Sequence, residues 1–172
     1  MRFIAFDLEL TCDKDVSDYP YQIIEIAAVF VASGQIRTTF QSYVKPGTAY
    51  DITPFCTELT GITADQVASS PGIRQVATNL SAFIQQAEPE LVISWGKSDY
   101  TLLEKECSNG SILFPLGSIP YLDFKKSFCQ QRKIKRVGLL TALKICELTA
   151  EGSPHSALSD ATNLARLYAS LN

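Results

Sequence analysis

The sequence predicts an α/β fold in which a mixed β-sheet carries helices on its faces. Three strand-like segments follow one another closely near the start of the chain, as in an antiparallel meander. Later strand-like segments alternate with helical ones, which is typical of parallel βαβ units. A long amphipathic helical segment ends the chain. Because no repeat or linker interrupts this order, we expect one domain over residues 1–172.

The leading strands are predicted from their β-branched and aromatic residues. Residues 2–9 form the first strand, which ends in two acids. Residues 23–31 are almost continuously apolar, so this strand is expected inside the sheet rather than at a solvated surface. A tight turn at residues 33–35 joins it to a third strand over residues 36–44, and the sequence Pro-Gly at 46–47 ends this hairpin.

The second half of the chain is predicted to be mainly helical. Val76, Leu80, Phe83 and Ile84 share one helix face, and Pro89 closes that helix before a short strand. The further elements, in order, are the strand 91–94, a helix over about 99–107, a loop over 109–118, a strand near 121–123, and helices over about 137–147 and 157–171. The last helix is expected to bury one side, formed by Ala157, Ala161, Leu164, Ala165, Tyr168 and Leu171.

The composition predicts a soluble, cytoplasmic protein. Hydrophobic residues make up 46% and charged residues 19% of the chain, which is ordinary for a globular domain. No apolar stretch approaches the roughly 18 residues of a membrane span, so no membrane partner is expected. Asp7 and Glu9 interrupt any signal-peptide core. The five cysteines contain no Cys-x-x-Cys pair and are odd in number, which favours reduced thiols over a zinc site or a disulfide framework.

The net charge of −3 does not mark the whole molecule as a nucleic-acid binder, but the basic residues are unevenly distributed. Six of the fifteen lie within residues 125–136, namely Lys125, Lys126, Arg132, Lys133, Lys135 and Arg136. This basic segment has two interpretations. It is either a solvated loop and helix face or a local contact for a phosphate backbone.

Asp7 and Glu9 are the first candidates for chemistry. Residues two apart on a strand project to the same face, so the two carboxylates lie near each other. They repel, and no Lys or Arg stands between them; a cation that neutralises them would stabilise the pair. The alternative is a strand end that frays into solvent, where both acids are simply hydrated.

A second group of candidates opens the last helix. Asp160 lies in its first turn, where the helix dipole favours an acid even without a function. The only histidine, His155, precedes it by five residues, which within one helix is about 140° of rotation. If Ser156 is the N-cap instead, His155 stands in the preceding loop and can turn toward Asp160. A neutral imidazole among several acids can accept a proton from water, as two-metal phosphodiester hydrolysis requires.

Five stretches of the chain together resemble the DEDDh superfamily of 3′→5′ exonucleases, and most of all its Eri-type members. Three are the exonuclease motifs, Phe-Asp-Leu-Glu-Leu-Thr-Cys (6–12), Ser-Trp-Gly-Lys-Ser-Asp (94–99) and His-Ser-Ala-Leu-Ser-Asp-Ala (155–161). The other two are Phe-Cys-Thr-Glu-Leu-Thr-Gly-Ile-Thr (55–63) and Gly-Leu-Leu-Thr-Ala-Leu (138–143). The resemblance runs from residue 3 to about residue 169.

This resemblance implies a ribonuclease-H-like fold with a five-stranded mixed sheet. It implies two divalent metal ions, Mg²⁺ or Mn²⁺, and a 3′→5′ exonuclease that releases nucleoside 5′-monophosphates from single-stranded RNA or DNA, RNA being favoured. The site residues that it implies fall into three groups: the metal ligands Asp7, Glu9, Asp160 and Asp99, the general base His155, and the substrate contacts Leu10, Thr11, Phe55 and Leu59.

Two positions depart from the pattern of the family. Ser156 follows the motif histidine where Arg is common, and Lys97 stands where the second motif often has an acid. Both bear on how the substrate backbone is held. A DNA exonuclease of the proofreading type and a non-catalytic nucleic-acid- or partner-binding module remain as alternatives, as does a metal-dependent phosphatase acting on small molecules. The oligomeric state, monomer or homodimer, is left open by the sequence.

Overall fold

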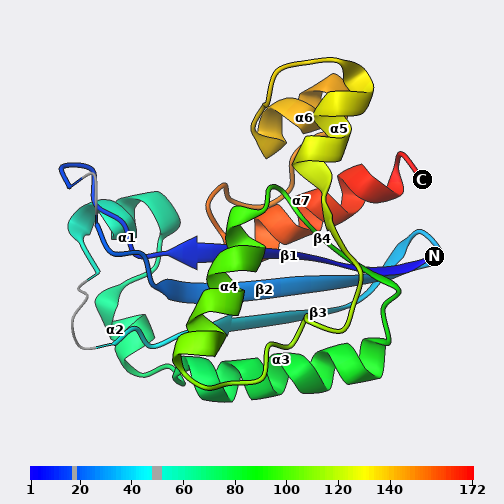
Figure 1. The fold of residues 1–172 in the computed structure, drawn as a ribbon. Helices are drawn as coiled ribbons and strands as arrows, with labels where there is room; N and C mark the ends of the chain where they lie inside the picture. Colours follow the sequence, from blue (N-terminus) through cyan, green and yellow to red (C-terminus); the bar gives the residue numbers. More distant parts are fainter. Residues whose placement is uncertain (17–18, 48–51) are drawn as a thin grey trace.

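A five-stranded mixed sheet forms the centre of the computed structural model, which describes residues 1–16, 19–47 and 52–172 (Figure 1). The strands lie in the order β3-β2-β1-β4-β5. Their bounds are β1 (Arg2–Leu10), β2 (Ile23–Ala32), β3 (Gln35–Tyr43), β4 (Leu91–Ser94) and β5 (Tyr121–Asp123). The first three are antiparallel, whereas β4 pairs in parallel with both β1 and β5. The predicted fold class is confirmed.

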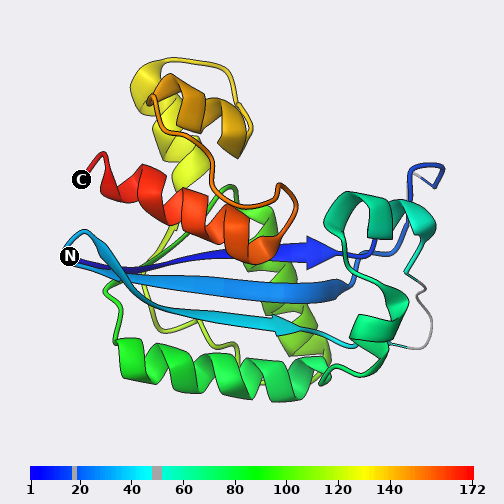
Figure 2. The same ribbon diagram turned by 180° about the vertical axis from the view of Figure 1, so that it is seen from behind.

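Helices cover both faces of this sheet. Their bounds are α1 (Pro54–Thr60), α2 (Ala64–Ala68), α3 (Ile73–Ala87), α4 (Ser98–Asn109), α5 (Phe124–Arg132), α6 (Leu139–Ile145) and α7 (Ala157–Ala169). α3 and α4 pack on one face, and α7 packs on the other beside α5 and α6 (Figures 1 and 2). None of the helices that the structure describes is long and apolar enough to cross a membrane.

The sequence did not predict three of the helices, α1, α2 and α5. α1 and α2 have only seven and five residues, too few for an apolar period to stand out. α5 lies in the basic segment and is polar on average, yet it buries Phe124, Phe128 and Cys129 at helical spacing. The prediction for the last helix was wrong at its end, because α7 stops at Ala169 and Leu171 is 39% exposed.

The alternation of β1 divides the core and places the acids. Ile4, Phe6 and Leu8 point toward α3 and α4, whereas Phe3 and Ala5 point toward α7. By the same alternation Asp7 and Glu9 continue the α7 side. β2 repeats this pattern, since Glu25 precedes the buried Ala27, Val29 and Val31 on that side. The face under α7 is therefore apolar along most of its length and acidic at the carboxyl end of β1.

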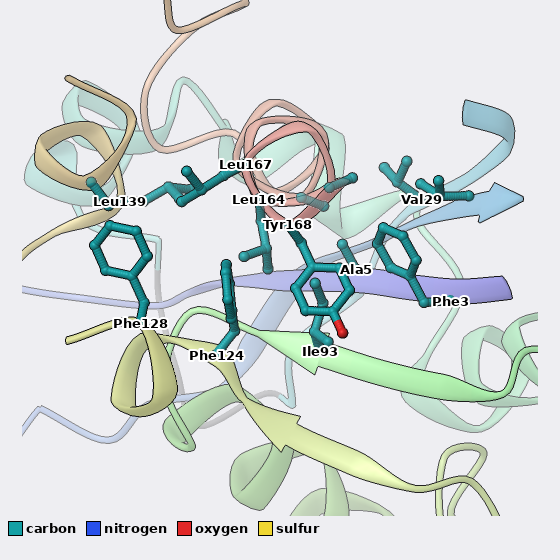
Figure 3. Packing of buried hydrophobic residues seen from close by; sticks show 14 of the residues in the cluster. Phe3, Ala5, Val29, Ile93, Phe124, Phe128, Leu139, Leu164, Leu167 and Tyr168 are labelled. Atoms are coloured by element: carbon teal, nitrogen blue, oxygen red, sulfur yellow. The ribbon is translucent and has the colours of Figure 1, made fainter. Parts of the chain in front are cut away.

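Aromatic residues hold α7 at the apolar end of this face (Figure 3). The ring of Tyr168 lies 4.8 Å from that of Phe3 and 4.9 Å from that of Phe124, centroid to centroid, in edge-to-face geometry. Each such pair contributes about 0.5–1.5 kcal/mol beyond area burial. Because Tyr168 near the end of α7 lies against Phe3 near the start of β1, the first turn of α7 lies over the acidic end.

α5 and α6 form a lobe beside this core, joined to the end of β4 through Trp95. The indole ring packs edge-to-face against Phe124 and Phe128 at centroid distances of 5.9 and 5.6 Å. Its Nε1–H donates a hydrogen bond to the carbonyl oxygen of Val137 at 3.2 Å. The lobe is thereby attached to the loop that leads into α4.

Candidate active site

Three carboxylates meet where β1 ends beneath the first turn of α7. One oxygen each of Asp7, Glu9 and Asp160 lies within 4.8 Å of the other two, close enough to share a metal ion. Asp7 and Glu9 project from the same side of β1, and Asp160 comes from the opening of α7. The strand does not fray there, because Glu9 pairs with Glu25 of β2 and is 8% exposed. The alternative of two hydrated acids at a strand end is therefore excluded.

The acids raise one another's pKa, because each negative charge makes ionisation of its neighbours less favourable. Burial, followed by the charges of Asp160, Glu25 and Asp99, raises the pKa of the Glu9 carboxyl to about 8. Burial and the neighbouring carboxylates raise the pKa of Asp7 well above its usual value as well. In the described part of the chain, the salt bridges are Arg2–Glu88 and Arg166–Glu151, so neither neutralises this cluster. Hard carboxylate oxygens with uncompensated charge suit Mg²⁺ or Mn²⁺.

Asp99 borders the trio from the first turn of α4. Its charge is the largest of the carboxylate contributions that raise the pKa of Asp7. Burial raises the pKa of Asp99 itself to about 7, although a hydrogen bond from Ser98 and the charge of Lys125 act in the opposite direction. Asp99 lies outside the set of oxygens within 4.8 Å. It is a neighbour of the trio and not one of its three close members.

His155 stands in the loop before α7, with Ser156 as the N-cap, which is the arrangement that lets it reach Asp160. Burial raises the pKa of Asp160 above its usual value. A hydrogen bond from the backbone N–H of His155 to the Asp160 carboxylate, together with the charge of the imidazole, acts in the opposite direction and offsets part of this rise. The histidine is exposed and has a φ of 58°, a left-handed conformation that few non-glycine residues adopt.

The loop that carries His155 is fastened to α7. Asn163 accepts a hydrogen bond from the Glu151 amide and donates one to the Glu151 carbonyl, both at 2.9 Å. Arg166 donates to the carbonyl oxygen of Thr149 at 2.8 Å and forms an ion pair with Glu151. Gly152 has a φ of 72°, and a Cβ there would collide with the side chain of Ser159. These contacts fix the loop to the helix that bears Asp160.

The four predicted substrate contacts gather at the end of β1 and on α1. The Cys56 thiol contacts the Leu10 carbonyl oxygen at 3.6 Å, and Thr53 donates to the carbonyl oxygen of Cys12 at 2.7 Å, so α1 is fastened to this strand end. Phe55 is half-buried and lines a pocket of about 260 Å³, and Leu59 is 36% exposed. Leu10 is half-buried.

Thr11 has a different environment from the other three. Its side chain is fully buried, and its hydroxyl donates to the carbonyl oxygen of Pro20 at 3.0 Å and accepts from the Gln22 amide at 2.8 Å. These bonds join the end of β1 to the segment before β2. Contact between Thr11 and a nucleotide stays a prediction.

Two residues near the acids were not singled out in the sequence. Glu25 contributes charge to the cluster from β2, and it was visible as the one acid inside the apolar run of residues 23–31. Lys125 was noticed only as part of the basic segment, but its charge acts on Asp99 and its side chain lies beside Gly96. Arg132 of the same segment instead lies over the Phe128 ring at 4.3 Å, and its hydrogen bond to the Cys146 sulfur at 3.3 Å links α5 to the end of α6.

Comparison with known proteins supports one interpretation of this geometry. The family model described as Exonuclease (RNase_T) matches residues 4–168. ERI1 exoribonuclease 2 of Danio rerio is 31% identical, over 95% of this chain and 34% of its own length. ERI1 exoribonuclease 3 of Homo sapiens is 30% identical, over 98% of this chain and 53% of its own length.

A solved structure shows the same likeness. The nuclease domain of 3′hExo, a DEDDh family member bound to rAMP, superimposes with a TM-score of 0.90 at 26% identity, covering 99% of this chain and 90% of that one. The chain spans about a third to a half of the length of the curated relatives that it matches.

Proposed function

Because the chain belongs to the RNase_T exonuclease family, and within it to the DEDDh exonucleases, we propose that it hydrolyses phosphodiester bonds from the 3′ end of single-stranded nucleic acid, with RNA favoured. One observation carries the proposal: Asp7, Glu9 and Asp160 converge within 4.8 Å directly beside the only histidine. The names of the relatives, exoribonucleases, favour RNA. The products would be nucleoside 5′-monophosphates.

We propose that the acids hold two divalent ions, Mg²⁺ or Mn²⁺. Asp7, Glu9 and Asp160 would supply the first ligands, and Asp99 would complete the set from α4. When bound, such ions neutralise charge on the scissile phosphate and lower the pKa of an attacking water. The raised pKa values of Asp7 and Glu9 support the proposal, since cations would offset the repulsion that causes them.

In this mechanism His155 acts as the general base. Its imidazole is exposed and stands on a loop that α7 holds in place. Imidazole is the side chain best suited to take up a proton near neutral pH. His155 would remove the proton of the water that attacks the phosphate.

The terminal nucleotide would lie against the surface formed by Leu10, Phe55 and Leu59. Phe55 and Leu59 belong to α1, which is fastened to the end of β1 just after Glu9. Apolar groups of this kind stack on bases and sugars without reading sequence. A 3′-terminal nucleotide must be unpaired to enter such a site, which would favour single strands over blunt duplexes.

We also expect the protein to act in the cytoplasm. All five cysteines carry free thiols in the structure, which suits a reducing compartment.

The test uses 5′-labelled single-stranded RNA and the matching DNA, each incubated with the protein and Mn²⁺, Mg²⁺ or EDTA. A ladder that shortens from the 3′ end and disappears with EDTA is expected, with RNA degraded faster than DNA. Faster cleavage of DNA would identify DNA as the preferred substrate and would still support the exonuclease reaction. Intact oligonucleotides in every lane, together with tight binding of the strand, would instead identify a nucleic-acid-binding module.

A further inference from the structure

Glu25 is a buried acid that the proposed chemistry does not use. It is 2% exposed, lies on β2, and faces Glu9 across the strand pair. A carboxylate that is withdrawn from water needs hydrogen-bond donors, because leaving it unsatisfied is costly. The partners of Glu25 therefore indicate why an acid stands in this apolar strand.

Both oxygens of Glu25 have donors. Oε2 accepts the backbone N–H of Ala157 at 3.0 Å, and Oε1 accepts the side-chain amide of Gln41 at 2.6 Å. Ala157 is the first residue of α7, so its N–H is one of the donors that a helix leaves without an internal partner. The side chain of the N-cap residue Ser156 makes no capping hydrogen bond. Glu25 thus serves as the acceptor for this helix start from a strand 132 positions earlier in the chain.

This bond holds the end of α7 that carries the chemistry. His155 stands two residues before Ala157, and Asp160 three residues after it. The far end of the helix is fixed by Leu164, Ala165 and Tyr168 in the apolar core, but the first turn lies over carboxylates that repel Asp160. The charge of Glu25 itself adds to this repulsion, but its hydrogen bond to the Ala157 amide ties the first turn of α7 to the sheet. The positive end of the helix dipole also favours the Asp160 carboxylate.

Glu25 does not belong to the metal-ligand group. The carboxylate oxygens within 4.8 Å of one another come from Asp7, Glu9 and Asp160, and both oxygens of Glu25 are already engaged in hydrogen bonds. Its hydrogen bonds are directed at the backbone of α7 and at β3.

We propose that Glu25 is a positioning residue: by binding the first amide of α7, it sets where His155 and Asp160 stand relative to Asp7 and Glu9. The inference rests on the proposed exonuclease function. Its physical basis is that a displacement of about 1 Å in a catalytic group can reduce the rate about a hundredfold.

Two substitutions separate the hydrogen bond from the charge. Glu25→Gln removes the charge but keeps the length of the side chain and an oxygen that accepts the Ala157 N–H. Glu25→Asp keeps the charge but is one methylene shorter, so the bond is lost. Gln41→Ala is the matched control, because it removes the other partner of Glu25 from the exposed strand β3.

The kcat of cleavage of a single-stranded RNA, its KM, and the exchange rate of the Ala157 amide with solvent would be measured for each variant. Glu25→Asp is expected to lower kcat by about tenfold or more with little change in KM, and to accelerate exchange at Ala157. Glu25→Gln and Gln41→Ala are expected to stay within about threefold of the wild-type kcat and to keep Ala157 protected.

Equal losses in Glu25→Gln and Glu25→Asp would overturn the inference and assign the effect to charge. Wild-type kcat in Glu25→Asp, or unchanged exchange at Ala157, would overturn it too. If Glu25→Asp does not fold, a large loss in Glu25→Gln still refutes the proposal, and its retained activity with a protected Ala157 amide supports it. If the wild-type protein itself does not cleave RNA, the proposed function fails. The wild-type control thus distinguishes that outcome from a failure of the proposal for Glu25.

Discussion

The charged residues at the two ends of β1 have different surroundings: those at the start have partners of opposite charge, and those at the end have neighbours of the same charge. At its start, Arg2 forms an ion pair with Glu88 at 3.0 Å and donates a further hydrogen bond to the Ala87 carbonyl oxygen. The Arg2 amide donates to the carboxylate of Glu90 at 2.9 Å. At the other end of the same strand, Asp7 and Glu9 face only further acids within their group.

The difference separates stability from function along one strand. Charges at the start of β1 have opposite partners and contribute modestly to stability. Charges at its end raise one another's pKa and destabilise the metal-free protein whenever they ionise. Repulsion among carboxylates that is confined to one place indicates a site where a cation would neutralise their charge. Substitutions at either end, metal binding and the pH dependence of stability can each test this difference between the two ends of β1.

Asp7→Asn should abolish exonuclease activity and the response to metal. The amide is similar in size but carries no charge, so one source of repulsion at the acidic end disappears. In EDTA the variant should therefore melt at a higher temperature than the wild type, although it is inactive. Thermal melting and the oligonucleotide assay check both parts. Glu90→Gln at the other end is the control and should keep full activity.

His155→Ala should lower kcat by about 10²–10⁴, the usual contribution of a general acid or base. Metal affinity should be close to that of the wild type, because the substitution leaves the proposed ligands on β1 and α7 intact. Titration with Mn²⁺ followed by thermal melting, alongside steady-state kinetics, measures the two quantities. A parallel loss of metal binding would show that the histidine is needed to build the site.

Mg²⁺ or Mn²⁺ should stabilise the wild-type protein by about 2.7 kcal/mol at a concentration one hundred times Kd. The acids repel one another until a cation is present, so the ion binds the native state in preference to the unfolded chain. Calorimetry or melting with increasing ion concentration gives the shift. A melting temperature that is indifferent to both ions would contradict the metal site.

The stability of the metal-free protein should fall as the pH rises from about 4.5 to about 8. Glu9 has a pKa near 4.5 when unfolded and about 8 when folded, so between these values the native state retains a proton that the unfolded chain releases. Each such group contributes at most about 1.4 kcal/mol per pH unit. Urea unfolding in EDTA across this range measures the slope, and Glu9→Gln should make it less steep.

Arg2→Ala should have the smallest effect, a loss of about 0.2–1 kcal/mol in the free energy of unfolding. The guanidinium is partly solvated and its partner Glu88 is largely exposed, with side-chain exposures of 41% and 75%. Exonuclease activity should not change. A loss of activity here would mean that the two ends of β1 are coupled, contrary to the contrast drawn above.

The sequence predicted the sheet and the positions of the acids for physical reasons that the structure makes clear. Alternation on β1 is a local property, so the common face of Asp7 and Glu9 follows from two residues of spacing. The capping position of Ser156, and with it the loop location of His155, is equally local. These predictions required no knowledge of what lies opposite in space.

The remaining features depend on contacts between distant parts of the chain. The hydrogen bond between the Ala157 amide and Glu25 joins residues 132 positions apart, and no pattern within either segment predicts it. The burial of Thr11 depends on residues 20–22 folding back over it, so the two hydrogen bonds of its hydroxyl could not be predicted from the segment around it. α5 was missed because its basic residues hid the spacing of its three buried ones.

The attachment of the α5–α6 lobe through Trp95 gives the molecule an internal fluorescent reporter. Trp95 is the only tryptophan, so emission excited at the indole band comes from one place in the fold. Its ring is enclosed by Phe124 and Phe128 and its N–H is bound to Val137, while its chain leads within four residues to Asp99. Separation of the lobe from β4 would expose the indole to water and shift its emission to the red. Any rearrangement of the lobe when a metal ion or an oligonucleotide binds would therefore be visible in the emission of this one residue, without any label.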